Sequence, residues 1–158
     1  MIYIDIVYED ELSGTVIRKL LKHHNKFSIG NSYPKCGVTK IKKKIKGYNN
    51  ASIYTPYFVL TDLDTKKCAS ELIKEWIDFP KHPNLIFRVA VREVEAWVLA
   101  DRKGFSSFAS VNITKIPPKP DEIADPKLKL LEIIRKSKKR ALKEDILPRY
   151  DGDRIGPN

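Results

Sequence analysis

Two groups of acidic residues border a long stretch that contains no acids. Glu9, Asp10 and Glu11 stand just before this stretch, and Asp62 and Asp64 stand just after it. Carboxylates spaced D-x-D at the end of an extended segment share a face and can aim at one point. Mg²⁺ prefers such oxygen ligands and keeps waters that a phosphate can displace. The spacing predicts a site for Mg²⁺ or Mn²⁺. The alternative is that one Asp caps the next helix while the other acids are solvated.

The stretch between these acids carries the whole net charge. Residues 13–61 hold ten Lys or Arg and no acid, whereas the rest of the 158 residues has 20 basic and 20 acidic side chains, which gives a net charge of +10. A basic segment beside clustered carboxylates favours a nucleic-acid partner together with a divalent cation. A solvated surface that improves solubility is the alternative. The lysines expected to contact backbone phosphates are Lys40, Lys42, Lys43, Lys44 and Lys46.

Alternating strands and helices are predicted to position these groups. Strands are expected at residues 2–8, 27–33, 57–63 and 84–91, where β-branched and aromatic side chains are frequent. Helices are expected after each strand, at residues 12–24, 38–46, 65–77, 93–100 and 125–143. Gly47 is expected to end the second helix, and Thr65 and Asp125 are expected to cap the third and the last. This order predicts an α/β fold with an open parallel four-strand sheet, helices on both faces and a further C-terminal helix.

The parallel sheet predicts which acids meet. Ligands bind beyond the carboxyl ends of such strands, so Glu9, the D-x-D pair and the acids after the fourth strand should share one edge. Glu93 and Glu95 are two residues apart, about 200° on a helix, so only one of them can face this edge. Glu93 is nearer the strand end and is the candidate for a second metal or an orienting role. Arg92 is expected either to contact a phosphate of the substrate or to pair with a neighbouring acid.

Three protein families place acids in this manner. Haloacid-dehalogenase-like phosphatases need D-x-D-x-T, but Lys66 stands at the Thr position. Response-regulator receivers need a later strand-end lysine and a preceding Ser or Thr, whereas the fourth predicted strand ends A-V-R-E. A Toprim domain needs a Glu after the first strand and D-x-D after the third, which Glu9, Asp62 and Asp64 supply. Toprim domains have Gly after this Glu, where this chain has Asp10, a possible extra ligand.

Longer motifs carry a further resemblance. They are V-Y-E-D-E-L-S, K-K-K-I-K-G-Y-N-N-A, F-V-L-T-D-L-D and R-V-A-V-R-E-V-E-A-W-V-L-A-D, the last at residues 88–101. With them the chain resembles an uncharacterised prokaryotic family with a Toprim-like, Rossmann-like domain, often encoded beside ABC-type ATPases in defence loci. The resemblance implies a metal-dependent nuclease-like domain at residues 1–112. Residues 113–158 are expected to form a Pro-rich connector and a helical extension packed on it.

Two functional hypotheses remain open. The first is an enzyme that hydrolyses phosphodiester bonds in defence or DNA repair, with Mg²⁺ on Asp62 and Asp64 and with Glu9 as ligand or general base. The second is a non-catalytic module that binds nucleic acid or an ATPase partner. The sequence does not distinguish DNA from RNA as the nucleic-acid partner. It also leaves both a monomer and a homodimer open as the oligomeric state. No run of about 18 apolar residues and no signal-peptide pattern occur, so a cytoplasmic address without membrane association is expected.

Overall fold

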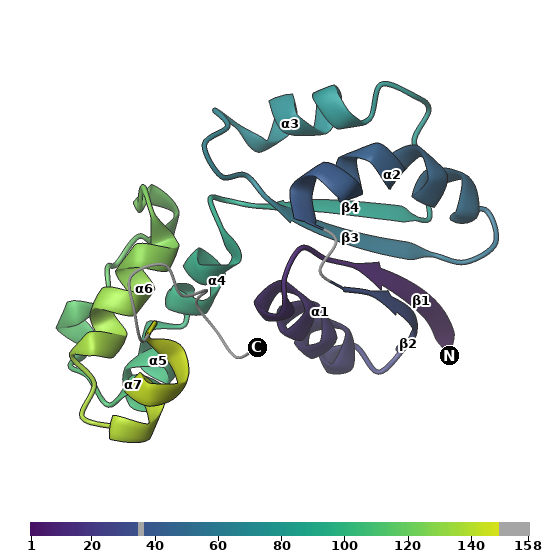
Figure 1. Ribbon diagram of the computed structural model, residues 1–158. Helices are drawn as coiled ribbons and strands as arrows, with labels where there is room; N and C mark the ends of the chain where they lie inside the picture. Colours follow the sequence, from purple (N-terminus) through teal and green to yellow (C-terminus); the bar gives the residue numbers. More distant parts are fainter. Residues whose placement is uncertain (35–36, 149–158) are drawn as a thin grey trace. The chain divides into compact units, whose positions relative to one another are not determined.

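The computed structural model describes residues 1–34 and 37–148, and the chain divides into two compact units, Met1–Val94 and Glu95–Asn158 (Figure 1). The first unit contains β1 (Ile2–Val7), α1 (Glu11–His23), β2 (Phe27–Tyr33), α2 (Gly37–Ala51), β3 (Tyr57–Asp62), α3 (Ala69–Trp76) and β4 (Leu85–Ala90). Next come α4 (Val94–Ala100), α5 (Arg102–Ala109), the short 3-10 turns η1 (Ile113–Lys115) and η2 (Pro120–Glu122), α6 (Pro126–Arg135) and α7 (Arg140–Ile146). The expected division at residue 112 stays a prediction.

The sheet has four parallel strands in the order β2-β1-β3-β4. The predicted α/β class with an open parallel sheet is therefore confirmed, and β2 forms at the residues 27–33 where a strand was expected. Val7 pairs with Tyr33 and Val59, and Asp62 pairs with Ala90, so the four carboxyl ends lie along one edge. Since β1 and β3 are direct neighbours, the segments that follow them leave the sheet side by side.

Helices cover both faces of this sheet, with α2 and α3 on one face and α1 on the other (Figure 1). Alternate residues of the strands point to opposite faces, so both sets of apolar side chains are buried. The core beneath α2 and α3 includes Val7, Val59, Phe87, Ile41, Ile45, Leu72 and Trp76. On α1, Ile17 and Leu21 are the large buried side chains.

Helix α2 continues beyond its predicted end at Gly47. Tyr48 and Asn49 are buried and extend the apolar face through Ala51. The Asn49 amide accepts from the His82 backbone N–H at 2.7 Å and donates to the Pro80 carbonyl at 3.2 Å. These contacts favour one more helical turn, and they outweigh the cost of about 1 kcal/mol for a solvated glycine within a helix.

Helix α3 begins later than predicted. The chain turns at Asp64 and Thr65, and Asp64 adopts a positive φ of 50°. The helix starts only at Ala69, with Cys68 at its cap position and no side-chain cap bond. The expected capping role of Thr65 is therefore wrong, because this residue belongs to the turn.

The second unit has a separate apolar core formed by Leu99, Phe105, Ala109, Ile116, Ile133 and Ile134. Asp125 caps α6 as predicted, since its Oδ1 accepts the Leu128 amide at 2.7 Å. The single helix expected at 125–143 is instead two helices. The buried Ser137 hydroxyl accepts the Lys139 amide at 3.0 Å, and this local bond competes with helix continuation between α6 and α7. Within the described residues, no helix is both long and apolar enough to span a bilayer.

Candidate carboxylate site at the strand ends

Glu9 joins the ends of β1 and β3. Its Oε1 accepts the Asp62 backbone N–H at 3.1 Å and also accepts a hydrogen bond from the Thr61 hydroxyl. Glu9 lies two residues beyond Val7, which pairs with Val59, so the strand register places it opposite the end of β3. Glu9 and Thr61 are 52 residues apart in the sequence, and their contact brings the two acidic segments together at adjacent strand ends.

The surroundings of Glu9 favour the protonated carboxyl. Burial raises the pKa of Glu9 above its usual value, while the hydrogen bonds from Thr61 and the Asp62 backbone act in the opposite direction. The nearby negative charges of Asp64 and Asp10 raise this pKa further. A carboxylate crowded by like charges gains from a proton or a cation, because either one relieves the repulsion.

The other two acids after β1 have structural partners. Asp10 is the N-cap of α1 and accepts the Ser13 amide at 2.8 Å. Glu11 pairs with Arg18 at 3.0 Å, and Arg18 also donates to the Tyr8 hydroxyl at 2.6 Å. Of these three consecutive acids, Glu9 is therefore the one joined to β3, and Asp10 takes the place of the expected glycine by capping a helix.

The D-x-D pair occupies two different backbone settings. Asp62 ends β3, and its Oδ1 accepts the amide of Val94, the first residue of α4, at 3.0 Å. Asp64 is exposed on the following turn. The two-residue alternation of an extended chain thus ends at Asp62. Helix capping by one of the pair, the alternative considered from sequence, is observed for Asp62, although the helix is α4 and not the next one.

Arg92 and Glu93 follow β4 at the same edge. The Arg92 carbonyl accepts the amides of Leu63 and Asp64 at 2.8 and 3.0 Å, and its guanidinium contacts the Asp64 carbonyl at 3.4 Å. Arg92 therefore holds the turn with both its carbonyl and its guanidinium, which contact backbone atoms of Leu63 and Asp64. Glu93 is half-buried and precedes Val94, so the topology brings it to this edge as predicted.

The lysines of α2 form an exposed face. Lys40, Lys42, Lys43, Lys44 and Lys46 are all exposed. Lys42 pairs with Glu75 at 2.6 Å, and Lys66 pairs with the same carboxylate at 2.9 Å. These two lysines, Lys42 first, lower the pKa of Glu75 to about 2. Sequence reasoning missed Thr61, Lys66 and Glu75. Only the position of Lys66, two residues after Asp64, gave any signal.

The donor set can be tested against a divalent cation. Glu9, Asp62, Asp64 and Glu93 supply carboxylate oxygens, which fit a hard cation in kind. Among the residues that the structure describes, no three acidic, His or Cys side chains are grouped closely enough to hold a metal ion. Glu9 and Asp62 each direct one oxygen to a backbone amide. The residues fit the cation chemically, and binding requires these side chains to reorient.

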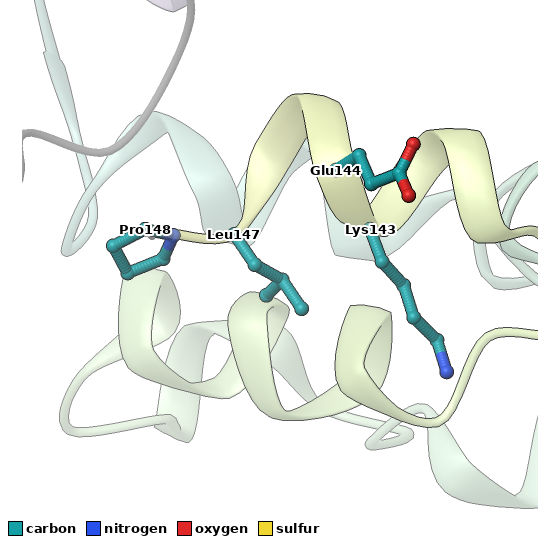
Figure 2. A pocket seen from close by; sticks show the side chains of 4 residues that line it. All are labelled: Lys143, Glu144, Leu147 and Pro148. Atoms are coloured by element: carbon teal, nitrogen blue, oxygen red, sulfur yellow. The ribbon is translucent and has the colours of Figure 1, made fainter. Parts of the chain in front are cut away.

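A pocket lies in the second unit, away from these carboxylates in sequence. It has a volume of about 420 Å³ and is lined by Lys143, Glu144, Leu147 and Pro148 (Figure 2). None of these residues was predicted as a site residue, and they offer one ammonium, one carboxylate and two apolar side chains.

Comparisons with protein-family models, with curated proteins and with solved structures found no match for this chain. The resemblance to Toprim-like proteins stays a prediction from the sequence motifs. The function must be inferred from the residues at the strand ends and from their contacts.

Proposed function

We propose that Glu9, Asp62 and Asp64, together called the carboxylate edge, form the active site of a Mg²⁺- or Mn²⁺-dependent enzyme that hydrolyses nucleic-acid phosphodiester bonds. The observation that supports this most is the hydrogen bond between Glu9 and the end of β3, in a setting where Asp64 and Asp10 add negative charge. A divalent cation would offset the negative charge that Asp64 and Asp10 add near Glu9.

The residues of the carboxylate edge have distinct roles in this proposal. Asp62 and Asp64 hold the cation, and Glu93, which follows β4, is a candidate for a further ligand. When bound, the cation polarises the phosphate and offsets the charge that develops in the transition state. Glu9 is either a further ligand or the group that takes a proton from the attacking water. Its raised pKa suits the second role, because a base acts best when its pKa lies near the working pH.

The basic residues supply the attraction for the substrate. Helix α2 follows β2, so its first turn starts at the edge where the strands end. Its exposed lysines carry charge without a rigid donor geometry for reading bases, and they suit contacts to backbone phosphates. Binding is therefore expected to depend little on sequence and to weaken steeply as salt rises.

The test separates metal chemistry from folding. Asp62→Asn keeps an oxygen that can accept the Val94 amide but removes the charge, and Asp64→Ala alters an exposed side chain. Both variants should reduce Mg²⁺-dependent cleavage of labelled DNA or RNA by at least about 100-fold. Nucleic-acid binding should stay equal or become tighter. Glu122→Gln, in the second unit, is the control for a charge change. Absence of cleavage by the unaltered protein with Mg²⁺ or Mn²⁺ would contradict the proposal.

One observation favours a second candidate, a non-catalytic module that binds nucleic acid or an ATPase partner. Asp10 and Asp62 both accept helix-terminal amides, as purely structural acids do. Calorimetry with Mn²⁺ distinguishes the two candidates. Equal binding by the unaltered protein and by Asp64→Ala would favour the module, whereas loss of binding in the variant would favour the enzyme.

A further inference from the structure

Two lysines from different segments meet on one carboxylate. Lys42 of α2 contacts Glu75 Oε1 at 2.6 Å, and Lys66 of the loop after β3 contacts Oε2 at 2.9 Å. The side chain of Lys42 is 45% exposed, that of Lys66 is 54% exposed and that of Glu75 is 42% exposed. Two ammonium groups are thus held on open surface around one anionic group with two oxygens. We refer to Lys42, Lys66 and Glu75 as the lysine clamp.

The lysine clamp borders the carboxylate edge along the chain. The Lys66 amide donates to the Leu63 carbonyl at 3.1 Å, within the turn that carries Asp64. Lys42 lies in the first half of α2, whose start is at the edge where β2 ends. A phosphate held by these lysines would therefore belong to a strand that also passes the carboxylates.

The contacts of the clamp are replaceable. Exposed ion pairs contribute little, because water screens them and ordering long side chains costs entropy. A phosphate offers the same lysines at least two anionic oxygens, and its hydrogen bonds to ammonium groups are charge-assisted. The low pKa of Glu75, about 2, keeps its carboxylate ionised at neutral pH, so it offsets part of the lysine charge.

We propose that Lys42 and Lys66 together bind one backbone phosphate of a nucleic acid in the place that the Glu75 carboxylate takes, so that Glu75 competes with the substrate. The identity of the ligand as nucleic acid rests on the proposed function. A purely structural clamp makes the opposite prediction, since removal of Glu75 would then loosen α3 against α2 without improving any binding.

The experiment measures binding without cleavage. Fluorescence anisotropy in EDTA follows labelled oligonucleotides of about 20 nucleotides, as single-stranded DNA, duplex DNA and RNA, at low salt. Glu75→Gln should bind at least one of these probes about 3- to 10-fold more tightly than the unaltered protein. Glu71→Gln is the matched control, because it removes the same charge from an exposed position one turn earlier on α3. It should change the affinity less than about twofold.

The lysines provide the second arm. Lys66→Gln should weaken binding more than Lys67→Gln, its exposed neighbour, and it should remove most of the gain from Glu75→Gln when the two are combined. Urea denaturation checks that each variant folds.

Three outcomes overturn the proposal. They are equal affinities for Glu75→Gln and Glu71→Gln, weaker binding by Glu75→Gln, and no binding of any probe by the unaltered protein. A protein that binds as described but never cleaves leaves the phosphate site standing and contradicts only the proposed hydrolysis.

Discussion

Asp5, in β1, and Glu9, just beyond the end of β1, are two carboxyl groups four residues apart that have different surroundings. Asp5 is 4% exposed in the middle of β1, and its two oxygens accept the backbone and side-chain N–H groups of Asn31 at 2.7 and 3.1 Å. Glu9 lies at the strand end, where Asp64 and Asp10 add like charge. Both carboxyls accept hydrogen bonds that the fold supplies, but Glu9 also has the charges of other acids nearby.

The position of Asp5 explains an irregularity of the sheet. Ile4 pairs with Ile29, but Ile6 pairs with Ser32, so Gly30 and Asn31 together stand opposite Asp5. Such a bulge removes an amide from the regular ladder. The Asp5 carboxyl accepts that amide and thereby fixes β2 against β1. A buried acid on a strand can therefore be structural, and burial alone does not identify a catalytic group.

The largest expected effect concerns Glu9. Glu9→Gln keeps an oxygen that can accept from Thr61 and the Asp62 amide, but it removes the charge. Cleavage should fall by at least about 100-fold, since a ligand or general base is lost. The free energy of unfolding near neutral pH should stay equal or rise. Single-turnover cleavage and urea denaturation measure the two quantities. A stable variant that retains full activity would remove Glu9 from the active site.

Asp5→Ala should show the converse pattern. It leaves the Asn31 amide without its acceptor, and losing a buried hydrogen-bond partner costs about 1 to 3 kcal/mol of stability. Cleavage per folded molecule should not change, because Asp5 lies within the strand and not at its end. Thermal and urea unfolding measure the first effect, and activity normalised to the folded fraction measures the second. Loss of activity in a fully folded variant would end the distinction between the two carboxyls.

Gly30→Ala probes the same contact from β2. A Cβ at Gly30 would lie 2.5 Å from Asp5 Oδ1, so the carboxyl or the bulge must shift. Such overpacking should cost about 1 to 2 kcal/mol of stability. The cost should shrink in the background of Asp5→Ala, where the obstructing oxygen is absent. A double-mutant cycle by urea denaturation measures this coupling, and additive costs would contradict it.

The sequence was sufficient to predict the sheet and the meeting of the acid segments. Runs such as residues 57–63 determine strands locally, and the alternation with helices determines parallel order. This is why Glu9 and Asp62 could be placed at one edge before their contacts were known. On α2, Ile41 and Ile45 are four residues apart and both buried, whereas Val38 at the start of the helix is 38% exposed.

The remaining features depend on contacts between distant residues. Asp62 accepts the amide at the start of α4 from a residue 32 positions away, and Glu75 pairs with Lys42, which is 33 positions away. Neither contact is indicated by a pattern of neighbouring residues in the sequence. The Thr65 cap was predicted wrongly because the positive φ of Asp64 extends the turn before α3. Asp5 carried a signal in retrospect, since an acid within an otherwise apolar strand requires donors of its own.

The smallest expected effect is the dependence of stability on pH. The pKa of Glu9 is raised in the folded state, so the folded protein binds this proton more tightly than the unfolded chain. The resulting stabilisation is fully present below the unfolded pKa of about 4.3 and is lost as pH rises through the folded pKa. The free energy of unfolding, relative to Glu9→Gln, should therefore fall as pH rises from about 4 toward neutral, through the raised pKa of Glu9.

Urea denaturation of both proteins across this pH range measures the difference. Parallel curves would show that neither burial nor the neighbouring charges raise the pKa of Glu9 in the folded protein. Added Mg²⁺ sharpens the comparison with Asp5, because a cation at the carboxylate edge favours ionised Glu9 and should flatten the pH dependence. In Asp5→Ala the pH-dependent difference at Glu9 should persist, because Asp5 lies within the strand and the charges that act on Glu9 come from Asp64 and Asp10.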